Sequence, residues 1–304
     1  MSEIEVRDLR KYYGEVRAVD GVSFDVRKSE VFGILGPNGA GKTTTLEIIE
    51  TLRKPDSGEI YLMGKDLRKE ARALKDKIGV QLQDTSLFPR LTVLETLNLF
   101  ASFYRRTASV LEMLKTVGLD EKKDALVETL SGGQQKRLSI ALALINDPEI
   151  IFLDEPTTGL DPQARRRVWE IVEKLRVKGK TVVITTHYME EAEELCDRVA
   201  IMDHGKIIAS GTPRDLINNY VPESKVFFRL EPPLDDEILL RMPGVKGVER
   251  DEGIYALRTD SPQKALMEIF DLATEKGCLL KEVTIKRASL EDVFLRLTGR
   301  RIRQ

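Results

Sequence analysis

Short runs of β-branched and other apolar residues alternate with longer amphipathic segments along the first two thirds of the chain. The runs predict strands, and apolar residues that recur every three or four positions predict helices. Strands are expected at residues 3–6, 22–26, 31–35, 60–62, 150–153 and 181–185, and helices at residues 42–52, 132–145 and 162–177. This alternation indicates a mostly parallel α/β sheet. The continuous apolar runs at 150–153 and 182–184 belong in its centre, because central strands are buried on both faces.

A helical region interrupts the α/β pattern. Apolar positions from residue 91 to residue 117 have helical spacing, with Thr92 as the expected cap of the first helix and a break near residues 105–108. Together with the helix predicted at 132–145, this region is expected to form a helical insertion at about residues 85–145. The insertion would lie within an α/β domain of residues 1–220.

A composition change around Pro222 indicates a linker to a second domain at residues 225–304. Strands are expected there at 225–230, 245–250, 254–258 and 279–285, and helices at 235–241 and 262–275. A last helix is expected at 289–297, with Ser289 as its cap and Asp292 three residues on. The order βαββαβ is that of a small ferredoxin-like α+β unit.

The composition is that of an ordinary globular protein, with 41% hydrophobic and 32% charged residues among 304. Forty-eight basic and 50 acidic residues leave a net charge of -2, so nucleic acid is not expected as a partner. Cys196 and Cys278 are too few and too far apart for a disulfide framework or a zinc site, which favours a reducing cytoplasm. The first residues do not resemble a secretory signal, and no apolar stretch approaches the roughly 18 residues of a membrane span. Membrane association is therefore expected only through a partner.

A glycine-rich loop follows the strand predicted at 31–35 and precedes the helix that begins at residue 42. It is a complete GxxxxGK[ST] motif, or P-loop. Its glycines let successive N–H groups point at the β- and γ-phosphates of a nucleotide, and the positive end of the helix adds to the attraction. Lys42 is expected to reach these phosphates, Thr43 to ligate Mg²⁺ and Thr44 to support the α-phosphate. The predicted nucleotide-binding residues here are Gly36, Pro37, Asn38, Gly39, Ala40, Gly41, Lys42, Thr43 and Thr44.

Two acidic residues, Asp154 and Glu155, end the strand predicted at 150–153. The carboxyl ends of strands in an open α/β sheet border its ligand crevice. Asp154 is expected to hold Mg²⁺ through water, and Glu155 is suited to orient or deprotonate the attacking water. The alternative is a solvated acidic pair without a function, and the P-loop upstream favours the catalytic interpretation.

Residues 130–134 read Leu-Ser-Gly-Gly-Gln. Ser131 can cap the helix that follows, and the two glycines leave its first amides bare for an anion, which makes a second phosphate site. The string closely resembles the LSGGQ signature of the ATP-binding cassette (ABC) family, and the resemblance extends in order along residues 3–218. Two cassettes of that family pack head to tail around two ATP molecules. The resemblance therefore implies that Ser131, Gly132, Gly133 and Gln134 bind the ATP of a second ABC subunit, either a copy of this chain or a relative.

Further residues resemble functional positions of the family. Tyr13 is similar to the aromatic residue that stacks on adenine, with Tyr12 as the alternative. Gln83 is similar to the glutamine that senses Mg²⁺ and couples to the helical insertion, with Gln81 as the alternative register. Asp161 is similar to the acidic residue that lines the dimer seam.

His187 follows a buried strand and resembles the family's switch histidine, which contacts the γ-phosphate. The resemblance thus gives a catalytic set of Lys42, Gln83, Glu155 and His187. His204 lies in a predicted turn and is interpreted as structural. The stretch 103–118, between the glutamine and the signature, is shorter than that of the family it resembles.

The resemblance implies an ATPase, with ATP and Mg²⁺ as cofactors, that powers a separate transmembrane permease from the cytoplasmic face of the cell membrane. Residues 287–294 resemble the tail of two-component exporter ATPases, which indicates export. The C-terminal domain is expected either to pack and assist dimerisation or to regulate. The alternative function is a soluble ABC-family ATPase acting on the ribosome or DNA. Such proteins usually carry two cassettes or a long coiled coil, and neither pattern occurs here.

Overall fold

A computed structural model of the chain describes residues 2–83 and 87–300. Two compact units divide the chain, with Pro213 the last residue of the N-terminal unit and Arg214 the first of the C-terminal unit. Residues 85 and 86, where the insertion was expected to begin, and residues 301–304 lie outside the described residues. Among the described helices, none has the length and apolar character needed to cross a membrane.

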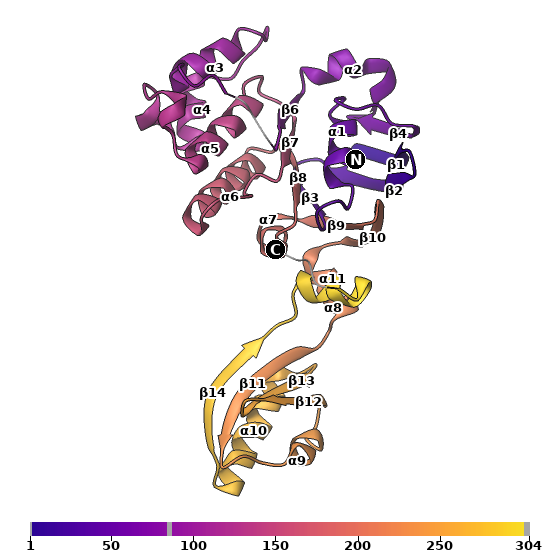
Figure 1. Ribbon diagram of the computed structural model, residues 1–304, viewed down its shortest axis with the longest axis vertical. Coiled ribbons are helices and arrows are strands. Elements are labelled where there is room, and N and C mark those ends of the chain that lie inside the picture. Colours follow the sequence, from indigo (N-terminus) through magenta and orange to yellow (C-terminus); the bar gives the residue numbers. More distant parts are fainter. Residues whose placement is uncertain (1, 84–86, 301–304) are drawn as a thin grey trace. The chain divides into compact units, whose positions relative to one another are not determined.

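A six-stranded sheet forms the centre of the N-terminal unit (Figure 1). Its order is β10-β9-β3-β8-β7-β6, and all neighbours are parallel except β9 and β10. The strands are β3 (Val31–Leu35), β6 (Ile78–Gln81), β7 (Ile150–Asp154), β8 (Thr181–Thr186), β9 (Arg198–Asp203) and β10 (Lys206–Gly211). Every residue of β3, β7 and β8 is buried, which confirms the prediction of central strands covered on both faces.

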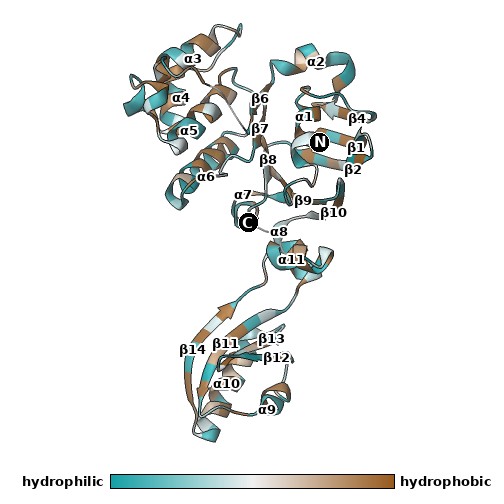
Figure 2. Cartoon of the chain, viewed as in Figure 1, coloured by the Kyte–Doolittle hydropathy of each residue, from teal (hydrophilic) through white to brown (hydrophobic). Residues whose placement is uncertain are grey.

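A second, antiparallel sheet has the order β2-β1-β4-β5. Its strands are β1 (Ser2–Tyr13), β2 (Val16–Arg27), β4 (Ser57–Leu62) and β5 (Lys65–Asp66). Ile4, Val6 and Leu9 of β1 are buried in one apolar core with Phe32 and Phe152 of the central sheet. The strands that were expected near residues 3, 22 and 60 therefore belong to a separate sheet. Figure 2 shows hydrophobic and hydrophilic residues mixed along β1 and β2, in keeping with their partial burial.

Helices cover the central sheet and form the insertion. The helices are α1 (Lys42–Ile49), α2 (Leu67–Lys75), α3 (Val93–Ala101), α4 (Val110–Val117), α5 (Gly132–Ala143), α6 (Pro162–Val177) and α7 (Met189–Leu195), with short 3₁₀ turns at Asp120–Lys122 and Val127–Thr129. In Figure 1, α3, α4 and α5 gather on the flank of the central sheet away from β1 and β2. This arrangement confirms the prediction of a helical insertion in an α/β fold.

Side-chain caps fix the ends of the insertion's helices. The Thr92 hydroxyl accepts from the Glu95 amide at 3.1 Å, while the Glu95 carboxylate accepts from the Thr92 amide at 2.8 Å. Ser109 caps α4, so the break between α3 and α4 spans residues 102–109 and is wider than predicted. Helix α5 ends at Ala143, two residues before its predicted end.

The C-terminal unit contains the predicted βαββαβ order. Its elements are α8 (Pro213–Tyr220), which begins at the boundary, β11 (Ser224–Glu231), α9 (Asp236–Leu240), β12 (Val245–Asp251), β13 (Ile254–Thr259), α10 (Pro262–Lys276), β14 (Leu279–Lys286) and α11 (Leu290–Thr298). The sheet order is β12-β13-β11-β14 with every neighbour antiparallel, the split βαβ arrangement of ferredoxin-like units. Its core joins β11 and β13 to α9 and α10.

Candidate nucleotide site

The loop between β3 and α1 requires glycine at two positions. Gly41 has a φ of +103°, and a Cβ added to it would lie 2.2 Å from the Ala18 carbonyl oxygen. A Cβ on Gly36 would lie 2.2 Å from the carbonyl oxygen of Met202. The P-loop is therefore packed directly against neighbouring backbone at both positions.

Lys42, at the start of α1, is buried beneath this loop, with its side chain 4% exposed. Its Nζ donates to the carbonyl oxygens of Gly36 at 2.8 Å and Pro37 at 3.1 Å, and lies 3.3 Å from Glu155 Oε1. Burial lowers the pKa of Lys42, while the carboxylates of Glu155 and Asp154 oppose that effect. The cation is thus held where phosphate oxygens of a nucleotide in the loop would meet it.

Asp154 lies at the carboxyl end of β7, beside the first turn of α1. Its Oδ1 accepts hydrogen bonds from the hydroxyls of Thr185 and, at 3.4 Å, of Thr43. Burial raises the pKa of Asp154, and these two hydrogen bonds oppose the rise. A hydroxyl and a carboxylate oxygen side by side, next to a phosphate cradle, are the donor set that suits Mg²⁺.

Glu155 adopts a left-handed backbone conformation, with φ at +45°. Its amide donates to the Thr185 carbonyl oxygen at 3.2 Å, which anchors it to β8. The carboxylate Oε2 accepts from the Thr158 hydroxyl at 2.9 Å, and Oε1 lies 3.3 Å from both Lys42 Nζ and His187 Nδ1. Burial alone would raise the pKa of Glu155, but Lys42, Thr158 and His187 together lower it. The group is therefore an ionised carboxylate at neutral pH.

A cleft of about 920 Å³ opens above the P-loop. The predicted P-loop and catalytic residues mostly line it. The predicted residues outside the lining are Gly36, Pro37, Asp154, Asp161 and the signature residues Ser131, Gly132, Gly133 and Gln134. The lining residues are Tyr13, Glu15, Val16, Arg17, Ala18, Asn38, Gly39, Ala40, Gly41, Lys42, Thr43, Thr44, Gln83, Glu155, Thr158, His187 and His204. Its volume lies within the range of small-molecule sites.

The two tyrosines at the end of β1 have different environments. Tyr12 donates its hydroxyl to Asp20 Oδ1 at 2.8 Å. Tyr13 lines the cleft, is 39% exposed, and has Lys11 Nζ and Arg53 Cζ each 5.5 Å from its ring centre. Only Tyr13 therefore presents a ring to a ligand in the cleft.

The two glutamines after β6 also differ. Gln81 is the last residue of β6, is 1% exposed and donates its side-chain amide to the Leu82 carbonyl oxygen. Gln83 lines the cleft, and its backbone carbonyl oxygen accepts a hydrogen bond from Lys136 Nζ of α5 at 3.4 Å. Gln83 thus joins the cleft to the helical insertion.

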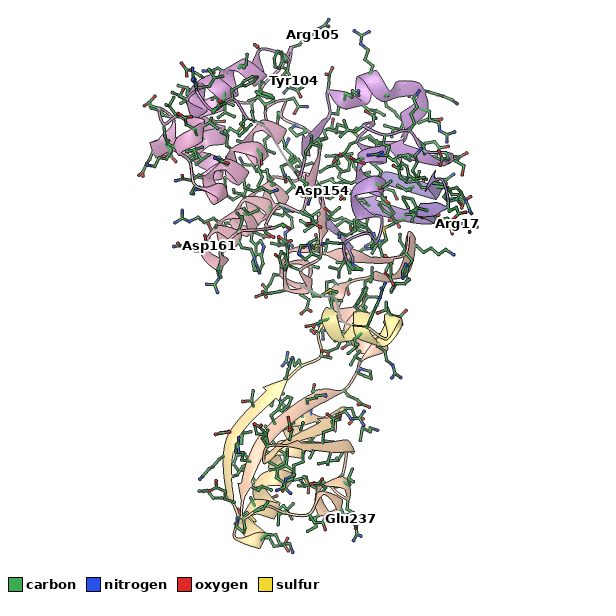
Figure 3. The ribbon with its side chains drawn as sticks, viewed as in Figure 1. Arg17, Tyr104, Arg105, Asp154, Asp161 and Glu237 are labelled. Carbon is green, nitrogen blue, oxygen red and sulfur yellow. The ribbon has the colours of Figure 1, made fainter. Side chains whose placement is uncertain are left out.

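His204 and Arg17 are among the lining residues that were not assigned a site role from the sequence. His204 was interpreted as structural, but the β9–β10 turn that carries it is tied to the P-loop through a 2.9 Å bond from the Gly205 amide to the Ala40 carbonyl oxygen. Arg17 lies on β2 and is labelled in Figure 3. Nothing local distinguishes either residue, because only the packing of β2 and this turn around the loop brings them to the cleft.

The signature segment lies outside this cleft, at the start of α5. The Ser131 amide donates to Gln134 Oε1 at 2.9 Å, and the Gln134 amide donates to the Ser131 hydroxyl at 3.4 Å. This capping box satisfies the third amide of the helix and leaves the amides of Gly132 and Gly133 available to an anion. Figure 3 labels Asp154 and, at the start of α6, Asp161. Asp161 Oδ1 accepts from the Gln163 and Ala164 amides, each at 2.9 Å.

The buried lysine, the two strand-end carboxylates and the glycine cradle define a P-loop nucleotide hydrolase. Comparison with known proteins is more specific. Residues 19–158 match the ABC transporter family, and residues 211–298 match the C-terminal domain described as ATP-binding protein DrrA1-3-like.

Relatives extend this match along the whole chain. The Nod factor export ATP-binding protein I of Ralstonia nicotianae is 41% identical over 309 residues, which cover 99% of this chain and 95% of that protein. The protein of the same name from a Rhizobium species is 39% identical, covering 98% of this chain and 97% of the relative. A dimeric bacterial ABC transporter cassette of known structure is 34% identical, with a TM-score of 0.63, and covers 69% of this chain and 98% of that one. The chain therefore belongs to the ATP-binding subunits of ABC transporters, and it is an ATPase that binds ATP.

Proposed function

We propose that this chain powers an exporter, by closing with a second cassette around ATP and reopening after hydrolysis. The group of Lys42, Glu155 and His187 at the P-loop supports this proposal most directly, because it brings a phosphate-binding cation and an ionised base to one point. The full-length relatives are named as export proteins, which favours an exporter over the soluble alternative acting on the ribosome or DNA.

Hydrolysis is an in-line attack of water on the γ-phosphate, with the protein supplying position and charge compensation. Glu155 orients the water and accepts its proton, and His187 contacts the γ-phosphate beside it. Lys42 and the P-loop amides neutralise the charge on the β- and γ-phosphates. When bound, Mg²⁺ would supply positive charge that offsets the negative charge of the phosphates. Thr43, Asp154 and Gln83 are the residues that would hold it.

The assembly needs a second ABC subunit, because the chain has one P-loop and one signature, and these lie at different sites. Ser131 to Gln134 of one subunit bind the triphosphate held by the other, and Asp161 lines the seam between them. We propose a second copy of this chain as that subunit. A separate transmembrane permease holds the pair at the cytoplasmic face of the membrane. Within each subunit, Tyr13 stacks on the adenine of the bound ATP.

The two halves of the chain have separate tasks in this proposal. Residues 1–220 bind and hydrolyse ATP. The helical insertion at about 85–145 contacts the permease, and Gln83 couples that insertion to the nucleotide. Residues 225–304 form an accessory domain that assists dimerisation or regulates it.

The experiment is Glu155→Gln with Mg-ATP, followed by light scattering and an ATPase assay. Hydrolysis is expected to stop while ATP binding persists, so the closed dimer accumulates. Glu149→Gln is the control, because Glu149 is an exposed carboxylate paired with Lys77 and away from the cleft. Unchanged turnover in Glu155→Gln would show that Glu155 is not the general base. A variant that binds ATP and stays monomeric would contradict the proposed ATP-induced dimer.

A further inference from the structure

Two side chains of α6 contact the segment that follows His187, and the proposed mechanism uses neither of them. Arg165 and Trp169 are four residues apart and so lie on the same face of the helix. Arg165 contacts Tyr188, and Trp169 contacts Glu191, three residues further along. The start of α7 is therefore held to α6 at two points.

The first contact leads directly to the switch histidine. The guanidinium Cζ of Arg165 lies 4.5 Å from the centre of the Tyr188 ring. That ring in turn lies 4.2 Å, centre to centre, from the imidazole of His187. A cation above an aromatic face is attracted by the ring quadrupole, so Arg165 fixes Tyr188, and Tyr188 supports one side of His187.

The second contact holds the helix that carries this segment. The indole N–H of Trp169 donates to Glu191 Oε1 at 3.1 Å, and Glu191 is fully buried in α7. The other oxygen, Oε2, has no hydrogen-bond partner within residues 2–83 and 87–300. Burial raises the pKa of Glu191, opposed by Thr186, Thr157 and Trp169. Because a buried carboxyl group is costly without hydrogen bonds, this bond holds the first turn of α7 against α6.

The other end of the same helix reaches the signature. Asp161 caps α6, and a Cβ added to Gly133 would lie 2.9 Å from Ala164 Cβ. The glycine thus brings α5 into close contact with the first turn of α6. One helix therefore contacts the signature segment at its first turn and, through Arg165, the tyrosine that packs against His187.

We propose that Arg165 and Trp169 are positioning residues for His187, through which α6 aligns the switch histidine with the γ-phosphate when the signature engages its ligand. This inference rests on the proposed function, because it assumes that His187 contacts the γ-phosphate. The two residues touch no nucleotide themselves, since neither lines the cleft. They border an open hollow of about 930 Å³ between α6 and α7, so shortening them leaves no enclosed cavity.

The test measures ATPase kinetics of Arg165→Ala and Trp169→Phe in the full chain. Each is expected to lower kcat roughly 10-fold while KM for ATP stays within about twofold, because displacement of a catalytic group affects the transition state while the P-loop is intact. Arg166→Ala is the matched control, because it removes the same charge from the next position of α6, where the side chain is exposed. Melting by circular dichroism checks the fold of each variant.

A second readout separates positioning from general destabilisation. In a Glu155→Gln background, the ratio of ATP affinity to ADP affinity reports contact with the γ-phosphate. Arg165→Ala is expected to lower this ratio as His187→Ala does, and the double variant is expected to lose no more than His187→Ala alone. Independent, additive losses would overturn the inference, as would wild-type kcat in both α6 variants. Should His187→Ala itself leave the ratio and kcat unchanged, the proposed role of His187 fails instead.

Discussion

Lys42 and Glu155 form a buried ion pair, and we expect removal of either charge alone to destabilise the protein more than removal of both. Nζ and Oε1 are 3.3 Å apart, with side chains 4% and 6% exposed. At an effective dielectric constant of about 20, two charges at this separation attract by roughly 5 kcal/mol. Loss of one partner from a buried pair costs about 3–5 kcal/mol, because the other charge stays buried and uncompensated. Lys42→Met is therefore expected to lower the free energy of unfolding by about 3 kcal/mol near pH 7 without nucleotide.

The pH dependence of this loss follows from the pKa of Glu155. In the native protein that pKa is lowered, so ionised Glu155 stabilises the fold above its unfolded pKa, and this stabilisation is lost as the pH falls through the folded pKa. Without Lys42, burial is expected to raise the pKa above the unfolded value of about 4.3, so the variant loses stability as the pH rises. The difference between the two proteins should therefore grow from about pH 4 to pH 7.

Urea unfolding followed by tryptophan emission measures this effect in the N-terminal unit alone, because Trp169 is the only tryptophan of the chain. The double variant Lys42→Met with Glu155→Gln is expected to regain most of the lost stability, since no buried charge of the pair remains. Lys77→Met is the control, because its partner Glu149 is half exposed and that pair contributes at most about 1 kcal/mol. Strictly additive single losses, or a loss that does not vary with pH, would refute the reasoning.

Three further predictions concern the cleft and the signature. Tyr13→Leu should weaken ATP binding about 10-fold through lost stacking, whereas Tyr12→Phe should leave the Kd from calorimetry unchanged and lower the Tm slightly. Gly133→Ala should lower the free energy of unfolding by about 1–3 kcal/mol through its clash with Ala164, and Ala164→Gly in the same chain should restore it. Gly41→Ala should abolish nucleotide binding at a cost of more than about 3 kcal/mol, because its Cβ would strike backbone at a φ of +103°; a soluble variant that binds ATP normally would contradict this.

Elements with a strong local pattern could be predicted closely. The strand at 31–35 and the helix at 162–177 have the bounds expected, because a continuous buried run and a proline-led amphipathic helix with an Asp161 cap are both local signals. The βαββαβ order of the C-terminal unit was also predicted, and in its first strand, β11, buried residues alternate with partly exposed ones.

Features that depend on long-range packing were not predictable in this way. The separate antiparallel sheet arises because β1 pairs with β2 and β4. The local residue pattern of a strand does not specify which other strands it pairs with. Helix α2 was missed because only Leu67 and Leu74 of its nine residues are buried. His204 and Arg17 reach the cleft only through packing. The proposed role of Trp169 depends on its hydrogen bond to Glu191, which lies 22 positions further along the sequence.

The central claim is that the P-loop of one chain and the signature of another grip the same triphosphate. Two variants in the Glu155→Gln background test it directly, Lys42→Ala with a disabled P-loop and Ser131→Arg with a disabled signature. Each alone is expected to remain monomeric with Mg-ATP. A mixture of the two is expected to form a dimer that retains one ATP, because one composite site is intact. If the mixture stays monomeric, or if either variant alone retains ATP in a dimer, the shared site is contradicted.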